Sequence, residues 1–149
     1  AQEMAEAVYQ YAAKSDIVVK TAAVGDYRPR AREAQKIKKT EGTLSVDLEK
    51  TEDILLELGR RKPSGQVLIG FAAETEHLEK HATEKLQAKN LDLIAANLLG
   101  GLDAGFGADT NKLTLFAAGA AKEALPLMEK SALAHLLLDR AVEILKEKE

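Results

Sequence analysis

Four basic side chains between residues 77 and 89 recur at a spacing of four residues. They are His77, His81, Lys85 and Lys89, in "HLEKHATEKLQAK". On a helix this spacing places them in one stripe along the surface. Within that helix neither lysine has an acidic residue three or four positions away, so Lys85 and Lys89 would repel each other. A shared anion would remove the repulsion, and the stripe therefore indicates either an anion-binding site or a solvated cationic face.

Other kinds of reactive site have weaker support in the sequence. His77 and His81 could ligate a metal from one helix face, but no HExxH pattern and no third ligand accompany them. The chain has no GxxxxGK[ST] and no GxGxxG, and the glycines of "GGLDAGFG" (100–107) have the wrong spacing for a phosphate loop. His135 lies on the apolar face of the last predicted helix, where packing is the simpler interpretation.

Two further groups could take part in binding an anion. The basic cluster "KIKK" (36–39) lies on a predicted ribbon, where it could bring a lysine over a polyanion or simply keep a strand edge soluble. Asp26 follows the small residues Ala22 and Ala23 at a predicted strand end. Its carboxylate could accept hydrogen bonds from a sugar or a base, or help to hold a metal ion.

The elements that must position these groups follow from periodicity and turn residues. Apolar residues at helical spacing predict helices, and short apolar or alternating runs predict strands. Thr51 and Thr75 are the predicted N-caps of the second and third helices. We expect helices over 1–14, 51–62, 75–89 and 130–149, strands over 16–24, 66–73, 91–97 and 112–116, a loop over 25–34, and a ribbon formed by "KIKK" and "LSVDL" around Glu41-Gly42.

The central strands predict the fold class. They are continuous apolar runs rather than alternating ones, which is typical of a mainly parallel sheet covered by helices on both faces, an α/β fold. In such sheets ligands bind at the carboxyl ends of the strands. Three of these ends carry small or polar residues, namely Ala22-Ala23, Phe71-Ala72-Ala73 and Ala96-Asn97. Small residues allow a ligand to approach the backbone, although close helix–strand packing would also use them.

The composition limits the classes of function. The chain of 149 residues is long enough for one domain, and its formal net charge of −3 implies no general attraction to nucleic acid or membrane. Aromatic residues are only 4%, too few for a nucleic-acid site built on stacking, and no apolar run could span a bilayer. The absence of cysteine excludes disulfides and is consistent with a cytoplasmic protein. Because helical periodicity begins at residue 1, we expect that an earlier segment of the domain is missing.

Six segments in this order are typical of one enzyme family. They are "AAVGDYRP" (22–29), "KIKK" (36–39), "KTEDIL" (50–55), "GFAAET" (70–75), "KLQAKNLDLIAAN" (85–97) and "DTNKLTLF" (109–116). The series covers essentially the whole chain. It resembles phosphopantothenoylcysteine synthetase, the phosphopantothenate–cysteine ligase of coenzyme A biosynthesis. In bacteria this ligase is usually the C-terminal half of a bifunctional flavoprotein.

The resemblance implies a Rossmann-like three-layer domain with a protruding two-stranded ribbon, through which it forms a homodimer. Residues 1–149 would be a single nucleotide-binding ligase domain that lacks its N-terminal segment. It would use CTP with Mg²⁺ to activate 4'-phosphopantothenate as an acyl-cytidylate, releasing pyrophosphate. The amine of cysteine would then displace CMP. FMN would be involved only if a decarboxylase domain is present elsewhere in the full protein.

The resemblance also implies roles for individual residues. Ala22, Ala23 and Asp26 would lie beside the nucleotide, with Asp26 as a candidate metal ligand, and Lys36 would be the mobile catalytic lysine. The other nucleotide-binding residues would be Glu52, Asp53, Ile54, Leu55, Phe71, Lys85 and Lys89. The chain departs from the family in lacking an N-terminal R-x-I-[ST]-N-x-S-S-G type motif, and in having Glu52 where the family often has proline.

Two other functions remain open at this stage. One is a dinucleotide-binding oxidoreductase domain on a similar sheet, against which the missing GxGxxG argues. The other is a non-catalytic nucleotide-binding or dimerisation fragment. The choice of CTP over ATP rests on the resemblance, because no residue distinguishes cytosine from adenine.

Overall fold

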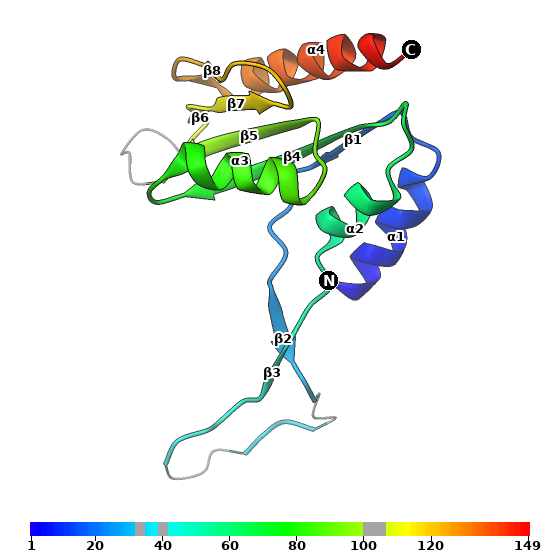
Figure 1. The fold of residues 1–149 in the computed structure, drawn as a ribbon. Coiled ribbons are helices and arrows are strands. Elements are labelled where there is room, and N and C mark those ends of the chain that lie inside the picture. The colour runs from blue at the N-terminus through cyan, green and yellow to red at the C-terminus, as the bar shows by residue number, and fades with distance from the viewer. Residues whose placement is uncertain (32–34, 39–41, 100–106) are drawn as a thin grey trace.

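Helices alternate with the strands of one sheet along most of the chain (Figure 1). The computed structural model describes residues 1–31, 35–38, 42–99 and 107–149. The helices are α1 (Gln2–Ala12), α2 (Ile54–Arg61), α3 (Leu78–Ala88) and α4 (Lys130–Lys148). The strands are β1 (Ile17–Lys20), β2 (Tyr27–Pro29), β3 (Leu48–Lys50), β4 (Val67–Glu74), β5 (Leu93–Leu98), β6 (Thr110–Asn111), β7 (Thr114–Ala117), β8 (Glu123–Ala124) and β9 (Met128–Glu129).

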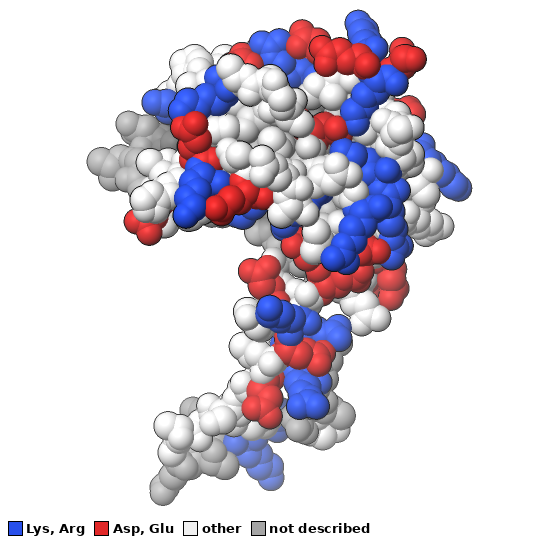
Figure 2. Space-filling view, in the orientation of Figure 1, with Lys and Arg blue, Asp and Glu red and all other residues white. Residues whose placement is uncertain are grey.

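The main sheet has the strand order β1-β4-β5-β7-β8. The β1–β4 and β4–β5 pairs are parallel, whereas β5–β7 and β7–β8 are antiparallel. Helices α1, α2 and α3 lie on one face of this sheet and α4 lies on the other (Figure 1). This arrangement confirms the predicted three-layer α/β fold with mainly parallel central strands. In the same view, basic side chains lie beside acidic ones over both the body and the ribbon (Figure 2).

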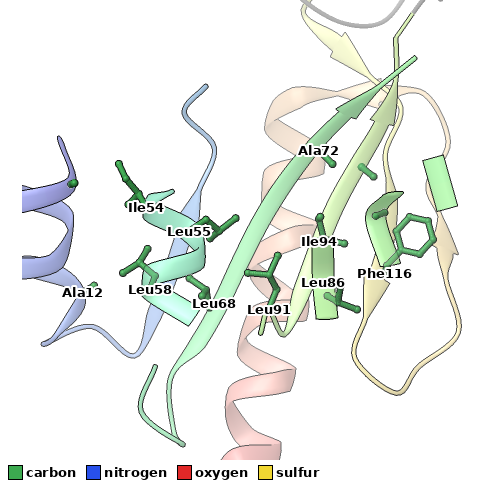
Figure 3. Close-up of a cluster of buried hydrophobic side chains, with 13 residues drawn as sticks. Ala12, Ile54, Leu55, Leu58, Leu68, Ala72, Leu86, Leu91, Ile94 and Phe116 are labelled. Atoms are coloured by element: carbon green, nitrogen blue, oxygen red, sulfur yellow. The ribbon is translucent and has the colours of Figure 1, made fainter. Parts of the chain in front are cut away.

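The core consists of one apolar cluster on each face of the sheet. Along β4, Leu68 and Ala72 point into the cluster beneath α1, α2 and α3, which Figure 3 shows in close-up. Val67 and Ile69 point the other way, into the cluster beneath α4. Val67, Leu68 and Ile69 are each 0% exposed. Because both faces are buried, this strand is a continuous apolar run, which is why its sequence predicts it well.

Two glycines allow α2 to pack closely in the first layer. A Cβ on Gly59 would lie 1.9 Å from the carbonyl oxygen of Lys89, so α2 meets the end of α3 backbone to backbone. A Cβ on Gly70 would lie 2.9 Å from side-chain carbons of both Leu55 and Leu91. Side chains larger than hydrogen would therefore separate α2 from α3 and from β4.

The ribbon is present, but its paired strands differ from the prediction. β2 and β3 pair antiparallel at Tyr27–Lys50, Arg28–Glu49 and Pro29–Leu48, so part of the predicted loop 25–34 is a strand. Residues 36–38 and 43–47 carry no strand, and Lys39 and Glu41 lie outside the described residues. The pairing extends at both ends through Arg30 N–H to Asp47 O and Thr51 N–H to Asp26 O, each 2.9 Å. These partners are too distant in sequence for periodicity to reveal.

The second and third helices start later than predicted. Asp53 rather than Thr51 is the N-cap of α2 and accepts a hydrogen bond from Leu56 N–H at 3.0 Å. The Thr51 hydroxyl instead donates to the carbonyl of Gly25. Thr75 is not a cap either, because pairing with β5 extends β4 through Glu74. Helix α3 then begins after His77, which is left-handed at φ 51°.

The prediction for the rest of the chain is mixed. The closing helix is confirmed as α4, with Leu133, Leu137 and Ala141 buried, but His135 on it is exposed and does not pack in the core. The short strands β6, β8 and β9 were not predicted, and residues 100–106 of the glycine-rich loop lie outside the described residues. No helix in the described part of the chain is long and apolar enough to cross a membrane.

Candidate functional site

Glu74, at the carboxyl end of β4, holds two members of the basic stripe on α3. Its Oε1 lies 2.6 Å from Lys85 Nζ, and its Oε2 lies 3.0 Å from His81 Nδ1. The Glu74 side chain is only 14% exposed, whereas that of Lys85 is 43% exposed. As predicted, the helix itself supplies no acidic partner for Lys85, but the neighbouring strand does.

Asp53 provides the equivalent partner for Lys89. Lys89 Nζ lies 2.7 Å from Asp53 Oδ2, while Oδ1 of the same carboxylate caps α2. The Lys89 side chain is 24% exposed. Each lysine thus has its own carboxylate, so mutual repulsion of Lys85 and Lys89 is no longer an argument for an anion. What remains is a row of alternating charges at the edge where β1, β4, α2 and α3 meet.

Both carboxylates are held in their charged form. Burial acts to raise the pKa of Glu74, but hydrogen bonds from Lys85 and His81 outweigh it and leave that pKa below its ordinary value. For Asp53, burial again acts upward, and the hydrogen bonds from Lys89 and from Leu56 N–H lower the pKa below its ordinary value. The site therefore keeps two negative charges beside its lysines at neutral pH.

The loop after β1 closes this edge of the sheet. Asp26 is exposed, and its backbone carbonyl accepts the 2.9 Å hydrogen bond from Thr51 N–H just before α2. Ala22 and Ala23 are also exposed, so a ligand can reach their backbone. The structure therefore brings the predicted residues Ala22, Ala23 and Asp26 to the start of α2.

The other predicted residues at the start of α2 have different surroundings. The Glu52 carboxylate accepts a 2.8 Å hydrogen bond from the Tyr9 hydroxyl of α1. Burial and this bond raise the pKa of Tyr9 to about 12. Ile54 and Leu55 are 2% and 7% exposed and belong to the core, so at these two positions only the backbone is left for a ligand.

Two predicted site residues are not brought to this cluster. The Phe71 ring packs with the apolar cluster beneath α4, on the opposite face of the sheet from Lys85 and Lys89. Lys36 is exposed on the ribbon, which projects away from the sheet (Figure 1). It borders a hollow whose described lining comes from the ribbon, namely Arg30, Ala31, Gln35, Ile37 and residues 44–47. Within one chain, Lys36 is therefore separated from the edge that carries Lys85.

The described ranges contain no group of three or more histidine, cysteine, aspartate or glutamate side chains arranged to hold a metal ion. The pair His77 and His81 stands with ring centroids 6.1 Å apart, and His81 is already bonded to Glu74. Asp26 could offer a single exposed carboxylate to a cation, and a bound molecule would supply the remaining ligands.

Sequence reasoning missed the role of Glu74, which lies between the predicted strand 66–73 and the predicted helix 75–89. The strand run "VLIGFAA" directly precedes it, and alternation along β4 puts it on the same face as Leu68 and Ala72. That alternation would have pointed Glu74 toward α3, had the strand been extended by one residue.

Known proteins resemble this chain over nearly its whole length. The sequence profile of the family described as "DNA/pantothenate metabolism flavoprotein C-terminal domain" matches residues 1–145. The chain belongs to this family. It is 48% identical over 147 residues to the coenzyme A biosynthesis bifunctional protein CoaBC of Bacillus subtilis strain 168, covering 99% of this chain and 34% of that protein. It is also 43% identical over 115 residues to a protein of an unknown prokaryotic organism named cysteine/cysteine sulfinic acid decarboxylase, covering 77% of this chain and 32% of that protein.

The fold has solved counterparts as well. The crystal structure of the C-terminal domain of a coenzyme A biosynthesis bifunctional protein CoaBC matches with a TM-score of 0.78 and 38% identity. That match covers 100% of this chain and 64% of the solved chain. These similarities confirm the family resemblance and the fold predicted from the six ordered segments. The chain nevertheless spans only about a third of the length of the curated relatives it matches.

Proposed function

We propose that the chain is the larger part of a ligase domain that joins 4'-phosphopantothenate to cysteine, at the expense of CTP, in coenzyme A biosynthesis. The observation that carries the proposal is the row of partly exposed lysines, Lys85 and Lys89, each fixed by a carboxylate at the carboxyl edge of a parallel sheet. Ligands bind at this edge in open α/β sheets, and the proposal places a nucleoside triphosphate there. Family membership supports the choice of reaction.

The proposed reaction has two steps. The carboxylate of 4'-phosphopantothenate attacks the α-phosphorus of CTP, forming an acyl-cytidylate and releasing pyrophosphate. The amine of cysteine then attacks the acyl carbon, an amide bond forms, a proton is lost from the amine and CMP leaves. Triphosphate, pyrophosphate and phosphorylated substrate are all anions, so preorganised cations lower the activation free energy of both steps.

Lys85 and Lys89 hold the triphosphate without giving up their carboxylates. An ammonium group has three N–H donors, and one bond to Glu74 or to Asp53 leaves donors free for phosphate oxygens. The carboxylates fix the direction of each lysine side chain, which reduces the entropy lost when the nucleotide binds. Charge-assisted bonds of this kind are among the stronger hydrogen bonds in proteins.

The start of α2 and the loop before it bind the nucleoside part. The exposed backbone at Ala22 and Ala23 and the exposed carboxylate of Asp26 face this edge, and the backbone of Ile54 and Leu55 begins the helix beside it. Asp26 would supply one carboxylate to a Mg²⁺ ion bound to the phosphates of CTP, and the ion would neutralise part of their charge. This fits the habit of Mg²⁺ of using one or two carboxylates together with substrate phosphates.

The ribbon supplies the remaining parts of the site. Lys36 acts as the mobile catalytic lysine when the ribbon reaches the carboxyl edge of a sheet at which a nucleotide is bound. Dimerisation through the ribbon is supported by its exposed apolar side chains. These are Tyr27 at 57%, Ile37 at 55%, Leu44 at 65%, Val46 at 56% and Leu48 at 58% exposure. Phe71 supports the nucleotide site in this proposal from the opposite face of the sheet, where its ring packs beneath α4.

The rest of the full protein lies outside the proposal for this chain. FMN belongs to a decarboxylase domain, if one is present in the same protein, and no residue here is assigned to it. The decarboxylase named among the relatives aligns over only 32% of its length, so its name does not identify the reaction of this domain. We place the enzyme in the cytoplasm, a reducing compartment with which the absence of cysteine is consistent.

Calorimetric titration tests the proposal. CTP with Mg²⁺ is titrated into the full-length protein, with ATP and NADH as comparators, and formation of the cysteine amide is followed in parallel. We expect CTP to bind preferentially and pyrophosphate to be released only when phosphopantothenate is present. Preferential binding of NADH would favour an oxidoreductase, and a stable dimer with no nucleotide affinity would favour a non-catalytic fragment. Either result would overturn the ligase.

A further inference from the structure

Lys20 is a third lysine at the same edge. It is the last residue of β1 and pairs in register with Gly70 of β4. A Cβ on Gly70 would meet Leu55 of α2 and Leu91, so this register position faces the layer of α2 and α3. Paired residues of neighbouring parallel strands point to the same side of a sheet. Lys20 therefore projects toward the start of α2, beside the Asp53–Lys89 pair.

Lys20 differs from its two neighbours in how its charge is compensated. Lys85 and Lys89 each have a carboxylate within 2.7 Å. Lys20 Nζ donates a 2.9 Å hydrogen bond to the carbonyl of Ala22, and no carboxylate in the described ranges forms an ion pair with it. A carbonyl bond leaves N–H donors on the ammonium group available to a ligand.

The surroundings of Lys20 act against its positive charge. Its pKa is lowered, first by burial and then by the nearby charge of Lys89, while Asp53 and Asp26 act in the opposite direction without cancelling the effect. An anion bound between Lys20 and Lys89 would offset both unfavourable contributions, because its negative charge would stabilise the two ammonium groups. The backbone of the loop at Ala22 and Ala23, which Lys20 itself braces, is exposed there.

We infer that Lys20 is a further phosphate-binding residue of the nucleotide site, acting with Lys89 on one phosphate group of a nucleoside triphosphate. The inference rests on the proposed function and adds to it a residue that neither the six ordered segments nor the basic stripe identified. The simpler alternative is that Lys20 only braces the loop after β1 through Ala22.

The test compares Lys20→Met with Lys14→Met in the full-length protein. Methionine keeps the length of the partly buried stem and removes the charge, and Lys14 is an exposed lysine before β1, at the other end of the strand. CTP, pyrophosphate and cytidine are titrated into each variant. We expect Lys20→Met to weaken CTP and pyrophosphate binding about tenfold, the loss of one charge-assisted hydrogen bond, and to leave cytidine unaffected. Lys14→Met leaves all three unchanged.

Other outcomes overturn the inference. If Lys20→Met binds CTP as the wild type does, or loses cytidine and CTP affinity equally, Lys20 is a loop brace. If the wild type itself does not bind CTP, the proposed function fails first, so the two failures are distinguishable. Should Lys20→Met not fold, acetylation of the wild-type protein decides the matter by mass spectrometry. Protection of Lys20 by pyrophosphate supports the inference, and equal labelling with and without pyrophosphate contradicts it.

Discussion

Lysine–carboxylate clusters stand at both ends of the sheet, and they differ in exposure. At the amino end, Asp92 before β5 accepts bonds from Lys62 Nζ at 2.9 Å, from Lys148 Nζ at 2.7 Å and from Leu68 N–H at 2.7 Å. The exposed fractions of the Lys62, Asp92 and Lys148 side chains are 8%, 12% and 21%. At the carboxyl end, Lys85 is 43% exposed although its partner Glu74 is 14% exposed.

The donors left over on the lysines differ as well. At the amino end, Lys62 also donates to the carbonyl of Asn90 at 2.6 Å and Lys148 to that of Gln66 at 2.8 Å. These bonds tie α2 and the end of α4 to the starts of β4 and β5. At the carboxyl end, Lys85 has one short bond to Glu74, and its side chain is 43% exposed. The same residue types thus fasten the fold at one end and leave room for a ligand at the other.

Replacing both lysines at the carboxyl end is the most direct test of the functional difference between the two clusters. We expect Lys85→Met with Lys89→Met to weaken CTP binding at least about 100-fold, because two charge-assisted contacts to phosphates are lost. Isothermal titration measures this affinity. Lys62→Met, at the other end of the sheet, is the matched control and should bind CTP as the wild type does. Equal losses in both proteins would mean that the two clusters do not differ in function.

The free energy of unfolding should rank the two ends of the sheet in the opposite order to CTP affinity. Lys62→Met leaves the Asp92 carboxylate, which is only 12% exposed, with Lys148 and Leu68 N–H, so we expect the free energy of unfolding to fall by about 2–3 kcal/mol. Lys85→Met removes a partner that water can replace at this half-exposed position, and should cost less than about 1 kcal/mol. Urea unfolding followed by circular dichroism gives both values. A larger loss for Lys85→Met would contradict the assignment of the two ends.

The pH dependence of stability would sharpen the same contrast with a smaller effect. Burial acts to raise the pKa of Asp92, but hydrogen bonds from Lys148, Leu68 N–H and Lys62 outweigh it and lower that pKa. Because the folded pKa lies below the unfolded one, the stabilisation is present above the unfolded pKa of about 4 and is lost as the pH falls through the folded value.

The measurement follows the melting temperature of the wild type and of Asp92→Asn from pH 7 to pH 2. The difference between the two proteins should be largest at neutral pH and shrink below about pH 4, as the wild-type carboxylate is protonated. A difference that stays constant over this range would show that the charge of Asp92 does not contribute. Glu74→Gln serves as the counterpart at the carboxyl end and should show the same trend with a smaller amplitude, since its lysine is more exposed.

Much of the fold could be predicted because its signals are local. The continuous run Val67–Leu68–Ile69 predicts a strand buried on both faces, and Leu133, Leu137 and Ala141 predict the buried face of α4. Boundaries that depend on long-range pairing could not be predicted. Thr51 has the residue type of an N-cap, but it bonds to Gly25 across the ribbon base, and Asp53 caps the helix instead.

The candidate site, like the fold, has features that the sequence predicts and features that depend on long-range contacts. The spacing of His81, Lys85 and Lys89 is visible in the sequence, but their acidic partners are not, because Glu74 belongs to β4 and Asp53 to α2. Asp26 reaches the start of α2 through a backbone bond between residues 25 positions apart. Lys36 and Phe71 belong to the same series of six sequence segments as the other site residues. Only the structure shows that Lys36 is on the ribbon and that Phe71 packs on the α4 face of the sheet.

By itself, the sequence determined the α/β class, the basic stripe and the membership of the family, because hydrophobic period, charge spacing and segment order are properties of the chain alone. The tertiary structure decided which carboxylate neutralises which lysine, which strands form the ribbon, and which lysine of the described site bonds to a carbonyl rather than to a carboxylate. Ion pairs and strand ladders join residues that are distant in sequence, and their geometry exists only after the layers of the sheet have packed.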